Sequence, residues 1–282
     1  MRQIAPSGGP GLSELKIGVV GAAGRMGQMI IRQIAATPGC RLIAASERPG
    51  SKELGQDAGR LAGLEPLGVT VSGDAAAVFA AAAVVTDFTS PEATVTHARL
   101  AAEHGTALVA GTSGMSAEQM AILGEAAQKA PIFWAANMSV GVTLLLHLVE
   151  EAAGALDPGY DIEILEMHHR HKVDAPSGTA LALGRAAAAG RGVPLEEVAE
   201  RGRDGVTGAR RRGAIGFAAL RGGDVAGDHS VMFAGEAERI ELTHKAEDRM
   251  IFARGALKAA LWGRGQPPGL YSMTDVLGLG DF

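Results

Sequence analysis

The stretch KIGVVGAAGRMG, residues 16–27, decides the fold of this chain. Its β-branched start predicts a strand over Lys16–Val20, and its glycines predict a tight turn into a helix over Gln28–Ala36. In such a turn the first glycine permits the bend, the second lets a pyrophosphate approach the backbone, and the third packs the helix on the strand. The GxxGxxG spacing alone is also compatible with an ordinary glycine-rich turn, so the surrounding pattern has to decide.

Strands and helices continue to alternate after this turn. Most predicted strands are short apolar runs that lead into a longer stretch with helical periodicity. This alternation is typical of an α/β fold with a Rossmann-like, doubly wound parallel sheet. The further strands are predicted over Arg41–Ser46, Val84–Phe88, Ala107–Ala110 and Ile132–Ala135, and the further helices over Pro91–His104 and Ser116–Lys129.

The pattern changes after Asn137. Strands with period-two alternation and no intervening helices predict an α+β domain with an open, mixed sheet. We therefore expect a flexible leader over residues 1–15, a first domain over residues 16–138 and 249–282, and a second domain over residues 139–248. The elements predicted in this half are strands over Ile162–Met167, Ile215–Leu220, Ser230–Ala234 and Arg239–Thr243, and helices over Val142–Ala153 and Met250–Trp262.

The composition argues against several classes of protein. The chain has 282 residues and a formal net charge of −5, so no global positive field favours nucleic acid. The arginine-rich run Arg201–Arg212 is interpreted as a solvated loop. The apolar runs fall short of the roughly 20 residues of a membrane span, and residues 1–15 lack the apolar segment of a secretory signal. With Cys40 as its one cysteine, we expect a cytoplasmic protein that binds neither nucleic acid nor membranes.

Charged and small polar residues follow the predicted strands at the edge where open α/β sheets bind ligands. Glu47 ends the second strand, where a carboxylate would hold the ribose hydroxyls of a dinucleotide, and the adjacent Arg48 can pair with a 2′-phosphate. Together they favour a site for NADPH or NADH, with a solvated surface charge pair as the alternative. Asp87–Thr89 and Gly111–Gly114 follow later strands and are candidates to contact the nicotinamide half.

The stretch HHRHKVDAPSGTA, residues 168–180, concentrates three of the eight histidines beside a lysine. A metal site would use His168 and His171 with Glu166 or Asp174, but neighbouring side chains of a strand point to opposite faces and rarely converge on one ion. An exposed basic loop is a second alternative.

A catalytic interpretation accounts for more of this stretch. Ser177 can cap a helix that runs to about Ala189, so that Gly178 and Thr179 present first-turn N–H groups to a carboxylate. Lys172 adds a positive charge, and a histidine can supply a proton near neutral pH. The stretch therefore predicts a pocket in which an anionic substrate is protonated.

Taken together, these motifs closely resemble the dihydrodipicolinate reductase family of bacterial enzymes. The histidine-rich stretch is the most specific of them, and the resemblance extends over about Lys16–Phe282. In chain order the motifs are GAAGRMG, ASERPG, DFTSPEAT, GTSG, AANMSVGV, EMHHRHKVDAPSGTA, GAIGFAALRGGDVAGDH and ERIELTHKAEDRMIFARGALKAALW.

The resemblance implies the NAD(P)H-dependent reduction of 4-hydroxy-tetrahydrodipicolinate (dihydrodipicolinate), a cyclic imine dicarboxylate, to tetrahydrodipicolinate in lysine and diaminopimelate biosynthesis. It implies that the first domain binds the dinucleotide, that the second binds substrate and forms a homotetramer through its sheet, and that Asn137–Gly141 is a hinge. Ser113 stands where the family commonly has Thr, and Met138 stands where an aromatic residue is often found. Both departures bear on cofactor preference.

The resemblance also implies roles for individual residues, without a metal. His168 would be a proton donor or acceptor and Lys172 a proton donor, and His169, Gly178 and Thr179 would contact substrate. The cofactor-binding residues would be Gly21, Ala22, Ala23, Gly24, Arg25, Met26, Glu47, Arg48, Gly111, Thr112, Ser113, Ala135, Ala136, Asn137 and Met138.

Four other functions are alternatives. A metal-dependent hydrolase would hold a tightly bound ion and lose activity with a chelator. A semialdehyde dehydrogenase needs a nucleophilic cysteine, and Cys40 precedes the second predicted strand, far from the expected site. A nicotinamide-sensing regulatory module would need the dinucleotide fold without the histidine pocket. A different NAD(P)H-dependent imine reductase would use the same pocket for another ring.

Overall fold

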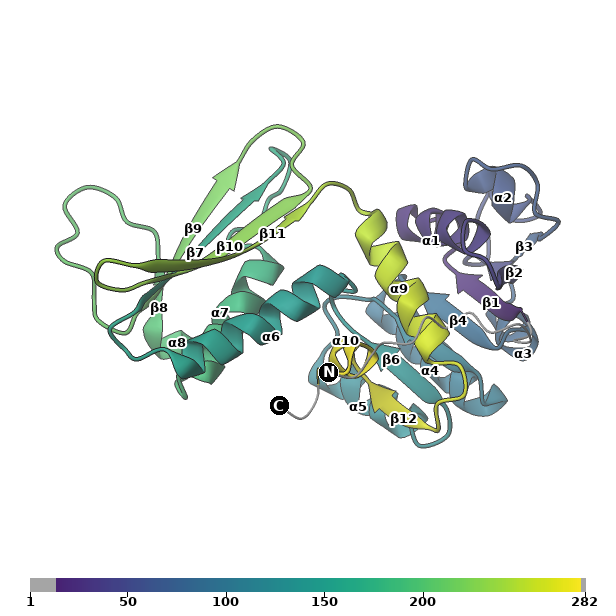
Figure 1. Ribbon diagram of the computed structural model, residues 1–282. Coiled ribbons are helices and arrows are strands. Elements are labelled where there is room, and N and C mark those ends of the chain that lie inside the picture. The colour runs from purple at the N-terminus through teal and green to yellow at the C-terminus, as the bar shows by residue number, and fades with distance from the viewer. Residues whose placement is uncertain (1–13, 280–282) are drawn as a thin grey trace. The chain divides into compact units, whose positions relative to one another are not determined.

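The computed structural model describes residues 14–279, which form two compact units (Figure 1). The first unit ends at Ala136 and resumes over Ala253–Val276, and the second comprises Asn137–Phe252 together with residues 277–279. Most of the leader expected over residues 1–15 lies outside the described residues. Leu15, however, is buried and begins the first strand, one residue earlier than predicted.

A seven-stranded sheet in which every pairing is parallel forms the centre of the first unit, with the strand order β12-β6-β5-β4-β1-β2-β3. The chain runs outward from β1 through β2 to one edge and then returns to β4 on the other side of β1. This reversal is the topological switch point of a doubly wound sheet and confirms the predicted fold class. The strands are β1 (Leu15–Val20), β2 (Cys40–Ser46), β3 (Val71–Ser72), β4 (Val84–Asp87), β5 (Ala107–Ala110), β6 (Pro131–Trp134) and β12 (Gly269–Tyr271).

Several helices of this unit start where the sequence supplies a side-chain cap. Ser90 accepts a hydrogen bond from the Ala93 amide at the start of α4, with Pro91 in the first turn, and Gly105 ends that helix in a left-handed conformation. Ser116 likewise forms a capping box that begins α5. The helices are α1 (Arg25–Ala35), α2 (Ala58–Leu61), α3 (Ala75–Ala81), α4 (Pro91–His104), α5 (Ala117–Ala126), α9 (Met250–Trp262) and α10 (Met273–Leu277).

A five-stranded mixed sheet forms the second unit, in the order β11-β10-β7-β9-β8. The pairs of β10 with β7 and β11 are antiparallel, and those of β9 with β7 and β8 are parallel, as the predicted open mixed sheet requires. The strands are β7 (Asp161–His168), β8 (Ala199–Arg201), β9 (Ile215–Arg221), β10 (Gly227–Ala234) and β11 (Arg239–Ala246), and the helices are α6 (Val140–Ala155), α7 (Gly178–Gly190) and α8 (Leu195–Val198).

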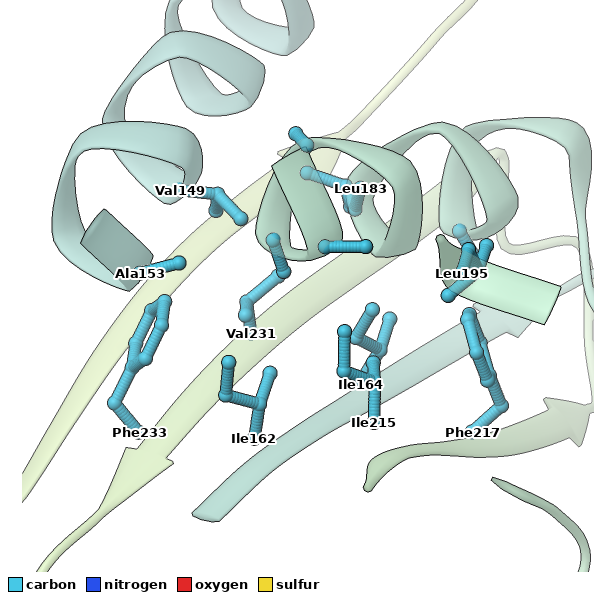
Figure 2. Packing of buried hydrophobic residues seen from close by; sticks show 14 of the residues in the cluster. Val149, Ala153, Ile162, Ile164, Leu183, Leu195, Ile215, Phe217, Val231 and Phe233 are labelled. Atoms are coloured by element: carbon cyan, nitrogen blue, oxygen red, sulfur yellow. The ribbon is translucent and has the colours of Figure 1, made fainter. Parts of the chain in front are cut away.

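Helices α6 and α7 cover one face of this mixed sheet. Alternate residues of the strands point toward the helices, and Figure 2 shows Ile162 and Ile164 of β7 beside Val231 and Phe233 of β10 in the resulting core. The next residue along β7, Leu165, points to the other face, as expected for a strand with period two.

No helix among residues 14–279 is long and apolar enough to span a membrane.

Two of the local differences from the sequence-based expectation concern the glycine turn and the arginine-rich run. Helix α1 begins at Arg25 rather than Gln28, because Gly24 serves as its N-cap and the glycine turn is correspondingly shorter. The run Arg201–Arg212, expected to be solvated, includes Arg210, whose side chain is 18% exposed and bonds to Asp161 and Glu163 at 2.8 Å. Its guanidinium also donates to three carbonyl oxygens, one of them that of Ile162, so this part of the loop is anchored to β7.

Candidate active site

Glycine is required at two positions of the turn after β1. Gly21 has a φ of +67°, and a Cβ there would lie 2.6 Å from the Thr89 methyl carbon. A Cβ on Gly27 would overlap the carbonyl oxygen of Gly21, so this glycine lets α1 pack closely on the turn. The N-cap of the 11-residue α1 is Gly24, which has no side chain that could bond to the first-turn amides. These amides therefore remain open to an anion.

The Glu47 carboxylate is tied to this turn. Its Oε2 accepts a hydrogen bond from the Ala23 amide at 3.1 Å, and its Oε1 accepts one from the Arg48 amide at 3.0 Å. The Ala22 amide donates to the Ser46 carbonyl at 3.0 Å. The end of β2 and the glycine turn are therefore joined, which brings together the two features that the sequence assigned to a dinucleotide.

A cavity of about 640 Å3 opens at the carboxyl ends of β1 and β4, the switch point of the sheet. Its volume lies within the usual range for small-molecule and cofactor sites. The arrangement fits a dinucleotide, because the glycine turn at the start of α1 and the Glu47 carboxylate share one cavity. Five of the predicted cofactor residues line it, namely Gly21, Ala23, Gly24, Glu47 and Arg48, whereas Ala22, Arg25 and Met26 adjoin it within the turn and α1.

A buried carboxylate supports the far wall of this cavity. Asp87 is fully buried and accepts hydrogen bonds from the Thr89 amide and hydroxyl at 2.9 and 2.6 Å. Its other oxygen bonds to His97 Nδ1 at 2.8 Å, and the His97 ring stacks on Phe79. His97 also lines the cavity, and through Asp87 it helps to hold Thr89 over Gly21.

The later strand ends of the first unit offer fewer free groups than expected. Thr112 is buried, its hydroxyl bonds to that of Thr94 at 2.7 Å, and its carbonyl accepts from Trp134 Nε1. Gly111 packs against the Phe88 ring, and Ser113 is exposed. After β6, Ala135 and Ala136 complete the strand end.

Asn137 and Met138 begin the second unit. Met138 is buried, so little of this residue is open to a ligand. Asn137 was predicted to contact the cofactor, but its Nδ2 donates to the Thr179 hydroxyl at 3.2 Å. The structure thus places Asn137 beside a predicted substrate residue.

A second buried carboxylate lies under the histidine cluster, on β7. Glu166 is 1% exposed, and its Oε2 is 2.7 Å from His168 Nδ1. Arg221 of β9 donates to both carboxylate oxygens at 2.8 Å, and the Ser177 amide donates to Oε1 at 3.1 Å. Burial alone would raise the pKa of Glu166, but the hydrogen bonds from Arg221 and His168 hold it below its usual value.

Glu166 was considered from the sequence only as a metal ligand. Its spacing of two residues from His168 on a strand, which puts both side chains on one face, was the available signal. Among the described residues, no group of three His, Cys, Asp or Glu side chains is arranged to hold a metal ion.

The lysine of the cluster has a local partner. Lys172 Nζ bonds to both carboxylate oxygens of Asp174, at 2.8 and 2.9 Å. The lysine side chain is 19% exposed and the aspartate 58%, so the pair is open to water on the aspartate side. The hydrogen bond from Lys172 lowers the pKa of Asp174. The rings of His169 and His171 lie 6.2 Å apart on the same segment.

The N-terminus of α7 is arranged to receive an anion. Ser177 caps it through a bond from the Ala180 amide, which leaves the first-turn amides of Gly178 and Thr179 without helical partners. A Cβ on Gly178 would meet only open space, so a ligand can approach the backbone there. The predicted substrate residues therefore share one helix end, and Ser177 links that end to the Glu166–His168 pair.

The switch-point cavity with its glycine turn and the Glu47 carboxylate at its edge, together with a unit that carries a histidine-lysine cluster, is typical of an NAD(P)H-dependent oxidoreductase. The family model for the N-terminus of dihydrodipicolinate reductase matches residues 15–138, and that for its C-terminus matches residues 141–277. The chain belongs to the dihydrodipicolinate reductase family.

Individual relatives agree with this assignment. The chain is 59% identical over 270 residues to the 4-hydroxy-tetrahydrodipicolinate reductase of Rhodopseudomonas palustris strain BisB18, covering 96% of this chain and 100% of the relative. Identity to the enzyme of the same name from Afipia carboxidovorans is 57% over 269 residues, covering 95% and 99%. The solved structure of a dipicolinate-bound dihydrodipicolinate reductase from Paenisporosarcina sp. TG-14 has the same fold, with a TM-score of 0.75, 24% identity and coverage of 93% and 98%.

The buried His229 gives the stability of the chain a defined pH dependence. Burial and the nearby His168 lower the pKa of His229 to about 4, whereas an unfolded histidine titrates near ~6.5. Between these values the unfolded chain binds a proton that the folded chain does not, so the free energy of unfolding decreases as the pH falls from about 6.5 to about 4. We expect His229→Gln to flatten this part of the profile, measured by urea unfolding between pH 7 and 4.5.

The exposed His104 provides the control for this measurement, because His104→Gln should keep the slope of the unchanged chain. Equal slopes for the unchanged chain and His229→Gln would show that His229 does not titrate in this way.

Proposed function

We propose that this chain reduces 4-hydroxy-tetrahydrodipicolinate to tetrahydrodipicolinate in diaminopimelate and lysine biosynthesis, with NADPH or NADH as the reductant. The observation that carries the proposal is that His168 and the N-terminus of α7 are both hydrogen-bonded to the buried carboxylate of Glu166. Loss of water from the hydroxylated ring gives a conjugated cyclic imine, to which one hydride and one proton are then added. The family membership and the named relatives support the same reaction.

The first unit provides the groups for the cofactor. The first-turn amides of α1 suit the pyrophosphate, Glu47 suits the adenosine ribose, and Arg48 suits the 2′-phosphate of NADPH. Ser113 and the backbone of residues 135–138 are assigned to the nicotinamide half. When bound, the reduced nicotinamide supplies the hydride. The dinucleotide-binding domain is accordingly proposed to comprise residues 16–138 and 249–282.

The second unit, proposed as the substrate domain over residues 139–248, provides the groups for the ring. The amides of Gly178 and Thr179 bind one carboxylate, and His169 contacts the substrate. His168 holds a proton at Nε2 for the ring carbon next to the one that is reduced, and Lys172 is a second proton donor. The cation of Lys172 also favours a substrate with two negative charges.

The mixed sheet is proposed to form a homotetramer. Its face opposite α6 and α7 carries Leu165 and Met167 of β7, Met232 of β10 and Leu220 of β9, the last being 47% exposed. Apolar side chains gathered on an open sheet face are typical of a subunit interface. Sedimentation velocity should give the mass of four chains, and a monomer would contradict the assembly.

The proposed location is the cytoplasm, where the reduced cofactors are available.

The reaction is tested by following NADPH and NADH oxidation while the substrate is formed in place from pyruvate and aspartate semialdehyde by the synthase that condenses them. We expect oxidation with either cofactor that depends on the synthase. Folded protein that binds cofactor but oxidises neither would contradict the proposed reaction and favour a nicotinamide-sensing module.

Replacing His168 tests the proton donor. We expect His168→Gln to lower kcat by about 100-fold or more, because glutamine fills similar space but cannot deliver a proton. Cofactor affinity, measured by nucleotide fluorescence, should change little, because His168 lies in the other unit. His104→Gln is the matched control and should retain full turnover. Unchanged turnover in His168→Gln would contradict the general-acid role.

Replacing Glu47 tests the ribose contact. We expect Glu47→Ala to weaken NADH binding by about 10-fold and NADPH binding less, because the carboxylate accepts ribose hydroxyls in NADH but repels the 2′-phosphate of NADPH. The exposed Glu65 offers a control, since Glu65→Ala removes the same charge outside the cavity. Equal losses of affinity for both cofactors would contradict the ribose contact. The role of Glu47 would then be limited to its hydrogen bond with the glycine turn.

A further inference from the structure

The geometry points to Glu166 as the positioning residue of the reaction: it fixes which nitrogen of His168 faces the substrate and ties that imidazole to the helix end that binds the substrate carboxylate. This inference rests on the proposed function for the identity of the substrate. Glu166 itself does not reach the reacting atoms, because it is 1% exposed and its bonds are made within the protein.

The tautomer of neutral His168 follows from the charge of its partner. An ionised carboxylate accepts hydrogen bonds and donates none, so the 2.7 Å contact to Glu166 requires the proton on Nδ1 of His168. Arg221 donates to both carboxylate oxygens and keeps the group ionised despite its burial. In neutral His168 the nitrogen Nε2 is therefore the one without a proton, and it is Nε2 that gains and releases the proton during turnover.

The Nε2 side of the His168 ring faces a glycine of the neighbouring strand. A Cβ on Gly227 of β10 would lie 3.0 Å from Nε2, so glycine leaves that nitrogen uncovered. The His229 ring meets the His168 ring edge to face, with centroids 5.1 Å apart, and limits its rotation. The His168 side chain is 12% exposed, so its ring reaches solvent in spite of these contacts.

The same carboxylate positions the substrate end of α7. The Ser177 amide donates to Glu166 at 3.1 Å, and Ser177 is the N-cap of the helix whose first residues are Gly178 and Thr179. The Ser177 hydroxyl bonds to His229 Nε2 at 3.0 Å. Since the His229 ring contacts the His168 ring, Ser177 is connected to His168 through His229 as well as through Glu166. Glu166 therefore sets the spacing between the proton donor and the proposed carboxylate site.

The substitution Glu166→Gln tests this inference, because it keeps the shape of the side chain. With Arg221 and Ser177 donating to its carbonyl oxygen, the glutamine turns its NH2 group toward His168 and favours the wrong tautomer. We expect kcat to fall about 10- to 100-fold, with the KM and cofactor affinity changing less than about 3-fold. The solvent deuterium isotope effect on kcat should increase, because proton delivery becomes slower relative to the other steps.

Glu163→Gln is the matched control. Glu163 lies on the same strand, is likewise paired with arginine (Arg203 and Arg210), and points to the opposite face of the sheet. It should retain turnover within about 2-fold and the isotope effect of the unchanged chain. A kcat for Glu166→Gln that equals that of the control, with an unchanged isotope effect, would overturn the inference.

A measurement without turnover separates this inference from the proposed reaction. In the unchanged chain labelled with 15N-histidine, His168 is assigned by the signal that His168→Gln removes. The inference requires Nδ1–H for neutral His168, and Nε2–H would overturn it even if the reductase assay succeeds. If the assay fails while Nδ1–H is observed, the reaction is contradicted and the positioning by Glu166 stands.

Discussion

The arrangement of the second unit depends on the burial of one ionised carboxylate. A buried charge is costly unless it is fully hydrogen-bonded, and Glu166 has donors from Arg221, His168 and the Ser177 amide. These donors come from different parts of the chain, so satisfying the carboxylate fixes strand β9, the histidine cluster and the start of α7 relative to β7. The energetic requirement of the fold thus also sets the geometry of the site.

The first unit uses carboxylates in a related way. Asp87 is fully buried, and its bonds to Thr89 and His97 give the switch-point cavity a firm wall. Glu47 lies at the edge of the cavity, where it accepts two backbone bonds and has lone pairs left for a ligand. A buried carboxylate therefore positions other groups, whereas a carboxylate at a cavity edge can itself bind.

Local pattern was sufficient to predict the fold class. The glycine turn, the alternation of strands with helices, and the later period-two strands each reflect interactions between residues close in sequence, and the parallel and mixed sheets follow from them. Short elements such as α2, β3 and α8 were missed, because a single turn or a two-residue strand has too little periodicity to detect.

The sequence could propose residues for the candidate site but not the connections between them. Arg221 is 55 positions from Glu166 along the chain, and no local pattern links them. The same holds for the bond between Asn137 and Thr179, which the sequence had assigned to different ligands. Such pairs arise from strand order and helix packing, which a single sequence does not specify in detail.

The most direct test of this account is a crystal structure of the chain with NADPH and dipicolinate, a flat ring with two carboxylates. The account predicts one carboxylate on the Gly178 and Thr179 amides, with the ring facing Nε2 of His168 while Nδ1 stays on Glu166. A ring bound away from α7, or a His168 ring turned so that Nδ1 faces the ligand, would contradict it.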